Sequence, residues 1–142
     1  MLDTDRPKDS ENVRGLWFVG PPSTGKSYAA RDLAMKLYNQ HPFTITESKW
    51  FDSYNKEKVI IIEDLDYITA HTHAHNLKHW SDKYACQAEF KGGKTWLHHE
   101  LLIVTSNYTI EELFQADDEK HSKRQQQARD KLYDAIKRRF EV

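Results

Sequence analysis

The chain has 142 residues, of which 38% are hydrophobic and 30% are charged, and its formal net charge at pH 7 is −1. This length suits one domain with a single core, and this composition excludes an intrinsically disordered chain. The balanced charge excludes a protein that is basic over its whole surface, so any surface for nucleic acid must be local. The lone cysteine, Cys86, excludes an internal disulfide and fits a reducing compartment. We interpret it as a small half-buried residue, with a nucleophilic role as the alternative.

Residues 1–12 are polar, lack the apolar core of a signal peptide, and are interpreted as a solvated lead-in to a domain that spans residues 13–142. The domain begins with the apolar run Leu16–Val19, which predicts a buried strand. Two further runs, Val59–Ile62 and Leu101–Thr105, predict strands of the same kind. All three are much shorter than the ~20 residues of a membrane helix, so the sequence predicts no membrane partner.

The loop after the first strand fits the pattern G-x-x-x-x-G-K-[ST], which binds nucleotide phosphates. Gly20 and Gly25 allow a tight turn whose N–H groups point at phosphate oxygens. Lys26 supplies a positive charge toward the β- and γ-phosphates, and the Ser27 hydroxyl suits Mg²⁺. The predicted nucleotide-binding residues are Gly20, Pro21, Pro22, Ser23, Thr24, Gly25, Lys26, Ser27 and Tyr28.

A helix is predicted directly after this loop, over Ser27–Tyr38, and its positive end is expected to face the phosphates. Its apolar stripe is predicted to consist of Ala30, Leu33, Ala34 and Leu37. Pro42–Thr46 then predicts another short strand. The alternation of strands with helices indicates an α/β fold with a largely parallel sheet.

Two acids, Glu63 and Asp64, follow the buried strand Val59–Ile62. In open α/β sheets, ligands bind at the carboxyl ends of the strands. Adjacent residues of an extended chain point to opposite sides, so we expect one acid to face the metal ion and the other the attacking water. We assign Glu63 to the metal and Asp64 to the water, with the reverse left open. Asp66 is interpreted as a solvated loop charge.

The next stretch is rich in histidine and contains His71, His73, His75 and His79. Because no cysteine or acid accompanies them in the usual spacing, we interpret the stretch as a solvated loop and predict no metal site there. A helix over Asn76–Tyr84 is predicted next, and one face of it should hold Leu77, Trp80 and Tyr84.

The sequence CQAEFKGGKTW (Cys86–Trp96) predicts a β-hairpin with Gly92 and Gly93 at its turn. Lys91 and Lys94 flank the glycines, so the tip is small and positively charged. Such a tip can approach a phosphate backbone closely and hold it independently of base sequence. A solvated turn is the alternative interpretation of these lysines.

The strand Leu101–Thr105 is followed by Asn107, again at a carboxyl strand end. Its amide can hydrogen-bond the γ-phosphate or the attacking water, and an ordinary strand-ending asparagine is the equal alternative. Two residues further on, Thr109 and Glu112 predict a capping box at the start of a short helix.

The tail predicts a long polar helix over Glu119–Arg138, with Arg138 and Arg139 near its end. An arginine far from the phosphate loop in sequence is a candidate arginine finger, which would complete the nucleotide site of a neighbouring subunit. The alternative is a basic helix end favoured by the helix dipole.

Taken in order, these motifs resemble the superfamily-three helicase domain of the replication initiator (Rep) proteins of small circular single-stranded DNA viruses, most closely the circovirus type. The segments that carry the resemblance are RGLWFVGPPSTGKS, KWFDSY, VIIIEDLD, DKYACQAEFKGGKTW, LLIVTSN and IKRRF. They cover roughly Val13 to Phe140. The Glu63–Asp64 pair departs from the two aspartates of many relatives, which leaves the roles of the two acids open.

The resemblance implies an AAA+-like P-loop NTPase, built as an α/β/α sandwich with a mainly parallel five-stranded sheet and a DNA-binding β-hairpin. It implies a hexameric ring that binds ATP and Mg²⁺ between subunits and moves 3′-to-5′ along single-stranded DNA. It also implies a nicking-endonuclease domain upstream and, for a viral protein, a location in the host nucleus, with the cytoplasm as the alternative.

The family's Walker A residues fall on Gly20, Gly25, Lys26 and Ser27, and its Walker B acids on Glu63 and Asp64. Its motif C residue falls on Asn107, its DNA-gripping hairpin on Lys91, Gly92, Gly93 and Lys94, and its finger on Arg138 or Arg139. Two other classes of function stay open: a nucleotide-dependent oligomerisation and DNA-binding module with little hydrolysis, and a small-molecule phosphotransferase.

Overall fold

A parallel sheet forms the centre of the chain. The structure, a computed structural model, describes residues 7–10, 12–21, 25–45, 54–66, 70, 74–90, 93–114 and 123–141. Within these ranges a five-stranded sheet has the order β2-β3-β6-β1-β7, and all its neighbouring pairs are parallel. Its strands are β1 Gly15–Val19, β2 Phe43–Ile45, β3 Val59–Ile62, β6 Leu101–Ser106 and β7 Phe140–Glu141. The predicted α/β fold with a parallel five-stranded sheet is therefore confirmed.

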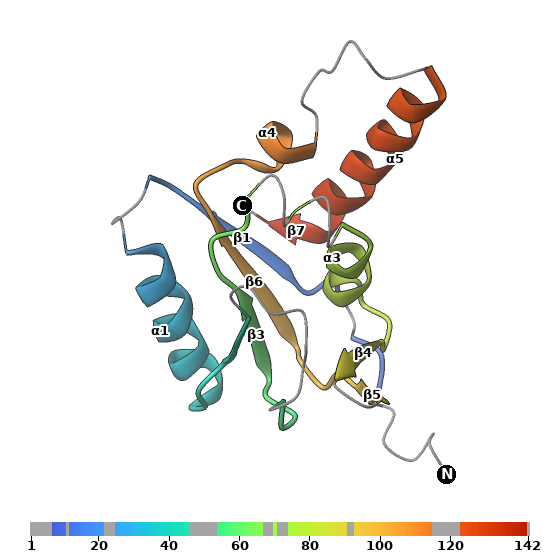
Figure 1. The fold of residues 1–142 in the computed structure, drawn as a ribbon. Coiled ribbons are helices and arrows are strands. Elements are labelled where there is room, and N and C mark those ends of the chain that lie inside the picture. Colours follow the sequence, from blue (N-terminus) through green and yellow to red (C-terminus); the bar gives the residue numbers. More distant parts are fainter. Residues whose placement is uncertain are drawn as a thin grey trace.

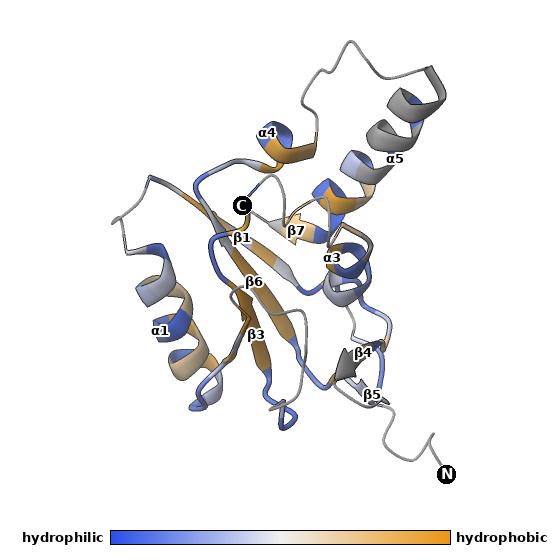
Figure 2. Ribbon diagram, in the orientation of Figure 1, coloured by the Kyte–Doolittle hydropathy of each residue, from blue (hydrophilic) through white to orange (hydrophobic). Residues whose placement is uncertain are grey.

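Helices cover both faces of this sheet (Figure 1), with α1 on one face and α3, α4 and α5 on the other. Their bounds are α1 Lys26–Tyr38, α3 Ala74–Ser81, α4 Ile110–Phe114 and α5 Lys123–Arg139. Successive residues of β3 point to opposite faces: Val59 and Ile61 pack with Ala30 of α1. Ile60 and Ile62 point to the opposite face, where they belong to a separate apolar core with side chains of α3, α4 and α5. Because both faces are covered, β3 and most of β6 are hydrophobic at successive positions, as Figure 2 shows.

Two predicted helix faces are wrong at their last positions. Leu37, in the last turn of α1, is 58% exposed, because the packed face of the helix runs through Ala30 and Ala34 to Tyr38, which lies against the same core. Tyr84 lies beyond the end of α3 and is 55% exposed. There the buried Ser81 hydroxyl donates a 2.6 Å hydrogen bond to the Leu77 carbonyl, a local bond that commonly accompanies the end of a helix.

The capping box before α4 is confirmed. The Glu112 amide donates to the Thr109 hydroxyl at 3.1 Å, and the Thr109 amide donates to the Glu112 carboxylate at 3.2 Å. These reciprocal bonds satisfy two N–H groups that the helix itself leaves unpaired. They fix the point where the chain leaves β6 and turns toward α5.

The predicted hairpin is also confirmed, as an antiparallel pair of β4 (Gln87–Phe90) and β5 (Gly93–Trp96). Phe90 lies opposite Gly93, so Gly93 is the first residue of β5 and was wrongly predicted to lie in the turn. Lys91 and Gly92 lie outside the described residues.

The last strand, β7, brings the end of the chain against the start of β1, where Phe140 lies opposite Gly15. Phe140 also packs edge-on against Trp17, with ring centroids 5.4 Å apart. A Cβ atom added to Gly15 would lie 2.3 Å from the Arg139 carbonyl oxygen. Gly15 is therefore required by the close approach of another stretch of backbone.

We expect Gly15→Ala to lower the free energy of unfolding by about 1–3 kcal/mol, because the added methyl group must push the end of the chain away from β1. Urea denaturation followed by circular dichroism would measure the change. Ala29→Gly, at an exposed position in α1, is a useful reference for a glycine–alanine exchange without such a contact. An unchanged midpoint for Gly15→Ala would contradict the close packing of β7.

Candidate nucleotide site

Three of the predicted site segments meet at one edge of the sheet. The phosphate loop follows β1, the two acids follow β3, and Asn107 follows β6, and these strands are parallel neighbours. Val19 lies opposite Ser106 in register, and the Gly20 amide donates to the Ser106 carbonyl at 3.1 Å. The carboxyl ends of the three central strands thus converge, as expected for a ligand site in an open α/β sheet.

Gly25 ends the phosphate loop and caps α1. Its φ of 82° is left-handed, a conformation that favours glycine, while a Cβ atom there would meet no atom of the described residues within 4 Å. The constraint on Gly25 that the structure shows is therefore its backbone conformation. The 13-residue helix that follows carries no acid in its first turn, so its positive end is not neutralised. Pro22, Ser23 and Thr24 lie outside the described residues.

Lys26 and Asn107, far apart in sequence, are in contact. The Lys26 ammonium donates to Asn107 Oδ1 at 2.9 Å and to the Pro21 carbonyl at 3.2 Å. Both bonds are exposed, so they hold the ammonium at the open side of the loop without burying its charge. The sequence predicted that Lys26 faces the β- and γ-phosphates, and it left Asn107 between a contact with the γ-phosphate or water and an ordinary strand end. The structure places the two side chains together.

Glu63 is held on the side of the sheet that α1 covers. Its side chain is 12% exposed and forms an ion pair with Arg31, which is half exposed on α1. Arg31 stands four residues after Ser27, so one face of the helix carries the hydroxyl and the guanidinium. Sequence reasoning missed Arg31, although this spacing from Ser27 was readable.

Asp64 is exposed, and its backbone is left-handed, with a φ of 55°. Its amide donates to the Thr105 hydroxyl at 3.1 Å, and the following amide, of Leu65, donates to the Thr105 carbonyl. The chain therefore turns at Asp64 and is no longer extended there. The two acids separate because of this turn, with Glu63 against α1 and Asp64 facing solvent.

The two arginines do not lie at this edge in their own chain. They end α5 and directly precede β7, which runs parallel to β1, so they stand at the amino edge of the sheet. Arg139 donates to the Asp82 carboxylate at 3.1 Å and to the Ala135 carbonyl at 2.7 Å. Arg138 is exposed. Tyr28, predicted to contact nucleotide, is 74% exposed near the start of α1.

The hairpin also stands at the amino edge, because β5 runs on through the buried Leu97 toward the start of β6. Lys94 is exposed on β5, opposite Glu89 in register. The candidate surface for nucleic acid and the candidate nucleotide site therefore occupy opposite edges of the sheet.

The remaining candidates for chemistry add no second site. Burial raises the pKa of Cys86 to about 11, so its thiol stays protonated and is a poor nucleophile. Within the described part of the chain, no three His, Cys, Asp or Glu side chains gather as metal ligands. His71 and His73 lie outside it, while His79 is exposed on α3. None of the described helices is both long and apolar enough for a membrane span.

Comparison with known proteins identifies the family of the chain. A family model described as RNA helicase matches residues 16–108. The replication-associated protein of goose circovirus is 32% identical over 90 residues, which is 63% of this chain and 28% of that protein. The replication-associated protein of porcine circovirus 2 is 32% identical over 93 residues, covering 64% of this chain and 27% of that protein. The matches thus span less than a third of these relatives.

Among solved structures, the A form apo structure of the NrS-1 C-terminal region covers 92% of this chain and 37% of its own, with a TM-score of 0.48 and 14% identity. A phosphate loop, two acids and an asparagine at the carboxyl edge of a parallel sheet define a P-loop NTPase-like domain. The chain belongs to the RNA helicase family, and its domain is a helicase domain of the Rep-like superfamily-three type.

Proposed function

We propose that this domain is the motor of a replication helicase, which hydrolyses ATP with Mg²⁺ and moves 3′-to-5′ along single-stranded DNA during rolling-circle replication of a circular DNA genome. The observation that carries the proposal is the contact of Lys26 with Asn107 beside Glu63, at the carboxyl edge of the sheet. The circovirus relatives, both replication-associated proteins, support the link to DNA replication.

The residues present fit a nucleotide with its metal ion. The left-handed turn at Gly25 and the unneutralised start of α1 suit phosphate groups, which Gly20 to Tyr28 would hold. The Ser27 hydroxyl and a carboxylate from the Glu63–Asp64 pair would hold Mg²⁺. The metal ion would neutralise the negative charge that develops on the transferred phosphoryl group.

Each side chain of the site has a task that follows from its position. Two acceptors hold the Lys26 ammonium at the open side of the loop, and this supports the proposal that its charge serves the phosphates. Glu63 lies on the same side as α1, which carries Ser27, and this supports its assignment to the metal. The exposed Asp64 is left to orient water and accept its proton, with Asn107 as a further hydrogen-bond partner.

The proposal extends to the assembly. Arg138 or Arg139 would complete the site of the next subunit in a hexameric ring, because both lie at the opposite edge from their own phosphate loop. Six hairpins would then hold the strand in the ring. A nicking domain upstream and a location in the host nucleus complete this proposal.

Phosphate release measured with no nucleic acid, with single-stranded DNA and with single-stranded RNA tests the reaction and the strand. We expect DNA to raise the rate most. Stimulation by RNA alone would reassign the substrate, and phosphorylation of a small acceptor would indicate a phosphotransferase. Nucleotide-dependent rings without hydrolysis would indicate the oligomerisation module. Unwinding of duplexes with a 3′ or a 5′ tail tests the direction.

Lys94→Ala should weaken binding to single-stranded DNA and leave nucleotide binding unchanged, because Lys94 is exposed on the hairpin, away from the phosphate loop. Removing one lysine from the phosphate backbone should reduce the slope of log affinity against log salt concentration by about 0.7. Fluorescence anisotropy at several salt concentrations measures both quantities. Lys131→Ala, exposed on α5, is the charge-matched control. An unchanged slope for Lys94→Ala would place the strand elsewhere.

A further inference from the structure

Glu63 carries a carboxylate that has little access to water. Its side chain is 12% exposed, and its amide donates to the Ile45 carbonyl at 3.0 Å, which holds the backbone in line with β3 as far as this residue. A carboxylate in such a place is costly unless a positive partner stands beside it. The chain supplies that partner from α1, where the Arg31 guanidinium donates to one carboxylate oxygen, Oε1.

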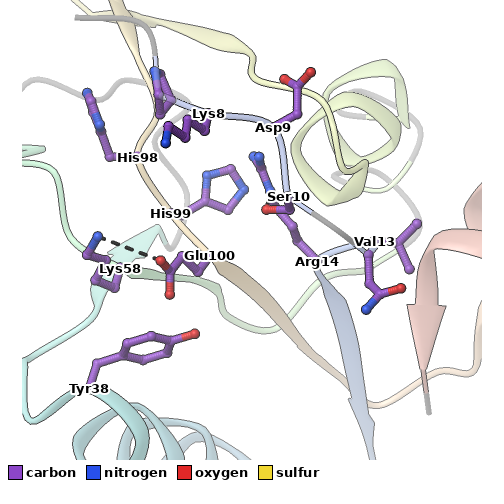
Figure 3. A pocket seen from close by; sticks show the side chains of 12 residues that line it. Lys8, Asp9, Ser10, Val13, Arg14, Tyr38, Lys58, His98, His99 and Glu100 are labelled. Atoms are coloured by element: carbon purple, nitrogen blue, oxygen red, sulfur yellow. Dashed lines mark hydrogen bonds and ion pairs between the residues drawn. The ribbon is translucent and has the colours of Figure 1, made fainter.

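An ion pair at the opposite edge of the sheet shows why this partner matters. There, in a pocket of about 730 Å³, Lys58 lies 3.8 Å from Glu100, and a dashed line marks the pair in Figure 3. Both side chains are about half exposed, so water stabilises each charge alone. Glu63 has no such access, and within the described residues Arg31 donates the one hydrogen bond to its carboxylate.

Arg31 is held less firmly than Glu63. Its side chain is 53% exposed, and the bond to Glu63 is the one that its guanidinium makes to the part of the chain that the structure describes. A half-exposed guanidinium with a single bond can exchange its partner at little cost. Arg31 therefore places a positive charge beside Glu63 without being locked there.

The same carboxylate is the one that we assign to the metal ion. Ser27, whose hydroxyl is assigned with it, stands one helical turn before Arg31, and side chains at this spacing lie about 5–6 Å apart. A divalent cation between Ser27 and Glu63 would thus lie beside a second positive charge. Between charges of +2 and +1 at about 6 Å, repulsion that is screened as in bulk water lowers the affinity about tenfold.

Nucleotide phosphates change this balance, because they bring negative charges to the start of α1 together with the metal ion. We propose that Arg31 is the counter-ion of Glu63 in the nucleotide-free domain and keeps free divalent cations out, so that the metal enters with the nucleotide. The inference rests on the proposed nucleotide site. Arg31 would set the order in which the site is loaded and would take no part in the chemical step.

The test measures binding of Mn²⁺, which replaces Mg²⁺ and is detected by electron paramagnetic resonance, to the chain without nucleotide. Arg31→Gln removes the charge but retains an N–H donor, and it should bind Mn²⁺ about tenfold more tightly than the parent. Arg31→Lys restores the charge and should return to the parental affinity. Lys58→Gln removes one charge beyond the other end of β3 and should leave the affinity unchanged.

Two results of this titration would contradict the inference. Weaker binding of Mn²⁺ by Arg31→Gln would show that the guanidinium orients Glu63 for the metal ion. Equal binding by Arg31→Gln and the parent would show that the charge of Arg31 does not act on the site.

A second variant locates the ion. Glu63→Gln added to Arg31→Gln should remove the gain in affinity, and a gain that survives would place the ion elsewhere and overturn the inference. These titrations need neither DNA nor hydrolysis. If the parent does not bind a non-hydrolysable ATP analogue in the presence of Mn²⁺, the proposed nucleotide site itself fails. If it binds the analogue but Arg31→Gln gains no affinity for Mn²⁺ alone, only the role of Arg31 is refuted.

Discussion

Lys26→Ala is expected to reduce steady-state phosphate release by about 10²–10³-fold, to near zero, with or without single-stranded DNA. Lys26 is the cation that the structure places at the open side of the phosphate loop, in contact with Asn107 and the Pro21 carbonyl. Alanine removes the charge that would stabilise the transferred phosphoryl group, while the left-handed turn at Gly25 stays in place. A coupled assay of phosphate release measures the loss.

The matched control is Lys36→Ala. Lys36 lies on the same helix but near its far end, where it pairs with Asp32 at 2.8 Å on the surface. The Lys36→Ala variant should hydrolyse nucleotide at the parental rate. If Lys26→Ala also hydrolyses at the parental rate, the nucleotide site is assigned wrongly.

Mixing Arg138→Ala subunits with Lys26→Ala subunits should restore hydrolysis that neither variant shows alone. An arginine finger contributes about 10³–10⁵ in rate, so Arg138→Ala alone should be nearly inactive. In the mixture, some interfaces combine an intact phosphate loop from the Arg138→Ala subunit with an intact arginine from the Lys26→Ala subunit. If the two variants are mixed in equal amounts and assemble at random, about one interface in four is of this kind. Phosphate release across a series of mixing ratios measures the recovery.

Arg139→Ala distinguishes the two arginines. Arg139 is partly buried and bonded to Asp82 and to the Ala135 carbonyl, so its removal should lower the urea midpoint. Arg138 is exposed, and its removal should leave the midpoint unchanged. Mixtures that stay inactive at every ratio, while both variants still assemble, would contradict catalysis between subunits. Recovery with Arg139→Ala only would assign the finger to Arg139.

Local patterns predicted most of the central layer. The runs Val59–Ile62 and Leu101–Thr105 are apolar at successive positions because helices cover both faces of their sheet. A continuous apolar run therefore predicted a strand in the middle layer of an α/β/α sandwich. The turn at Gly25 and the helix after it were predictable because glycine meets a local requirement of the backbone there. Asn107 was predictable because the carboxyl ends of parallel strands converge.

Contacts between distant segments were not predictable in the same way. β7 has two residues, too few for a periodic pattern, and exists because Gly15 leaves room for the chain to lie against β1. Arg14 has no sequence signature of burial, since its partners lie on Ser10 and on the Lys83 backbone. Leu37 was predicted to be buried from helical spacing alone, which does not decide between Leu37 and its neighbour Tyr38, the residue that packs against the core.

The pairing of β7 with β1 connects the phosphate loop mechanically with the backbone of Arg138 and Arg139. The phosphate loop is attached to one end of β1, and the backbone of the two arginines is attached, through Phe140, to the other end. Five residues of strand, about 17 Å, separate these attachment points. In the proposed ring, β1 would transmit a shift at one subunit's phosphate loop to the arginines at its other end, which we propose act in the neighbouring subunit's site. Successive subunits would then respond in sequence without any contact between their nucleotides.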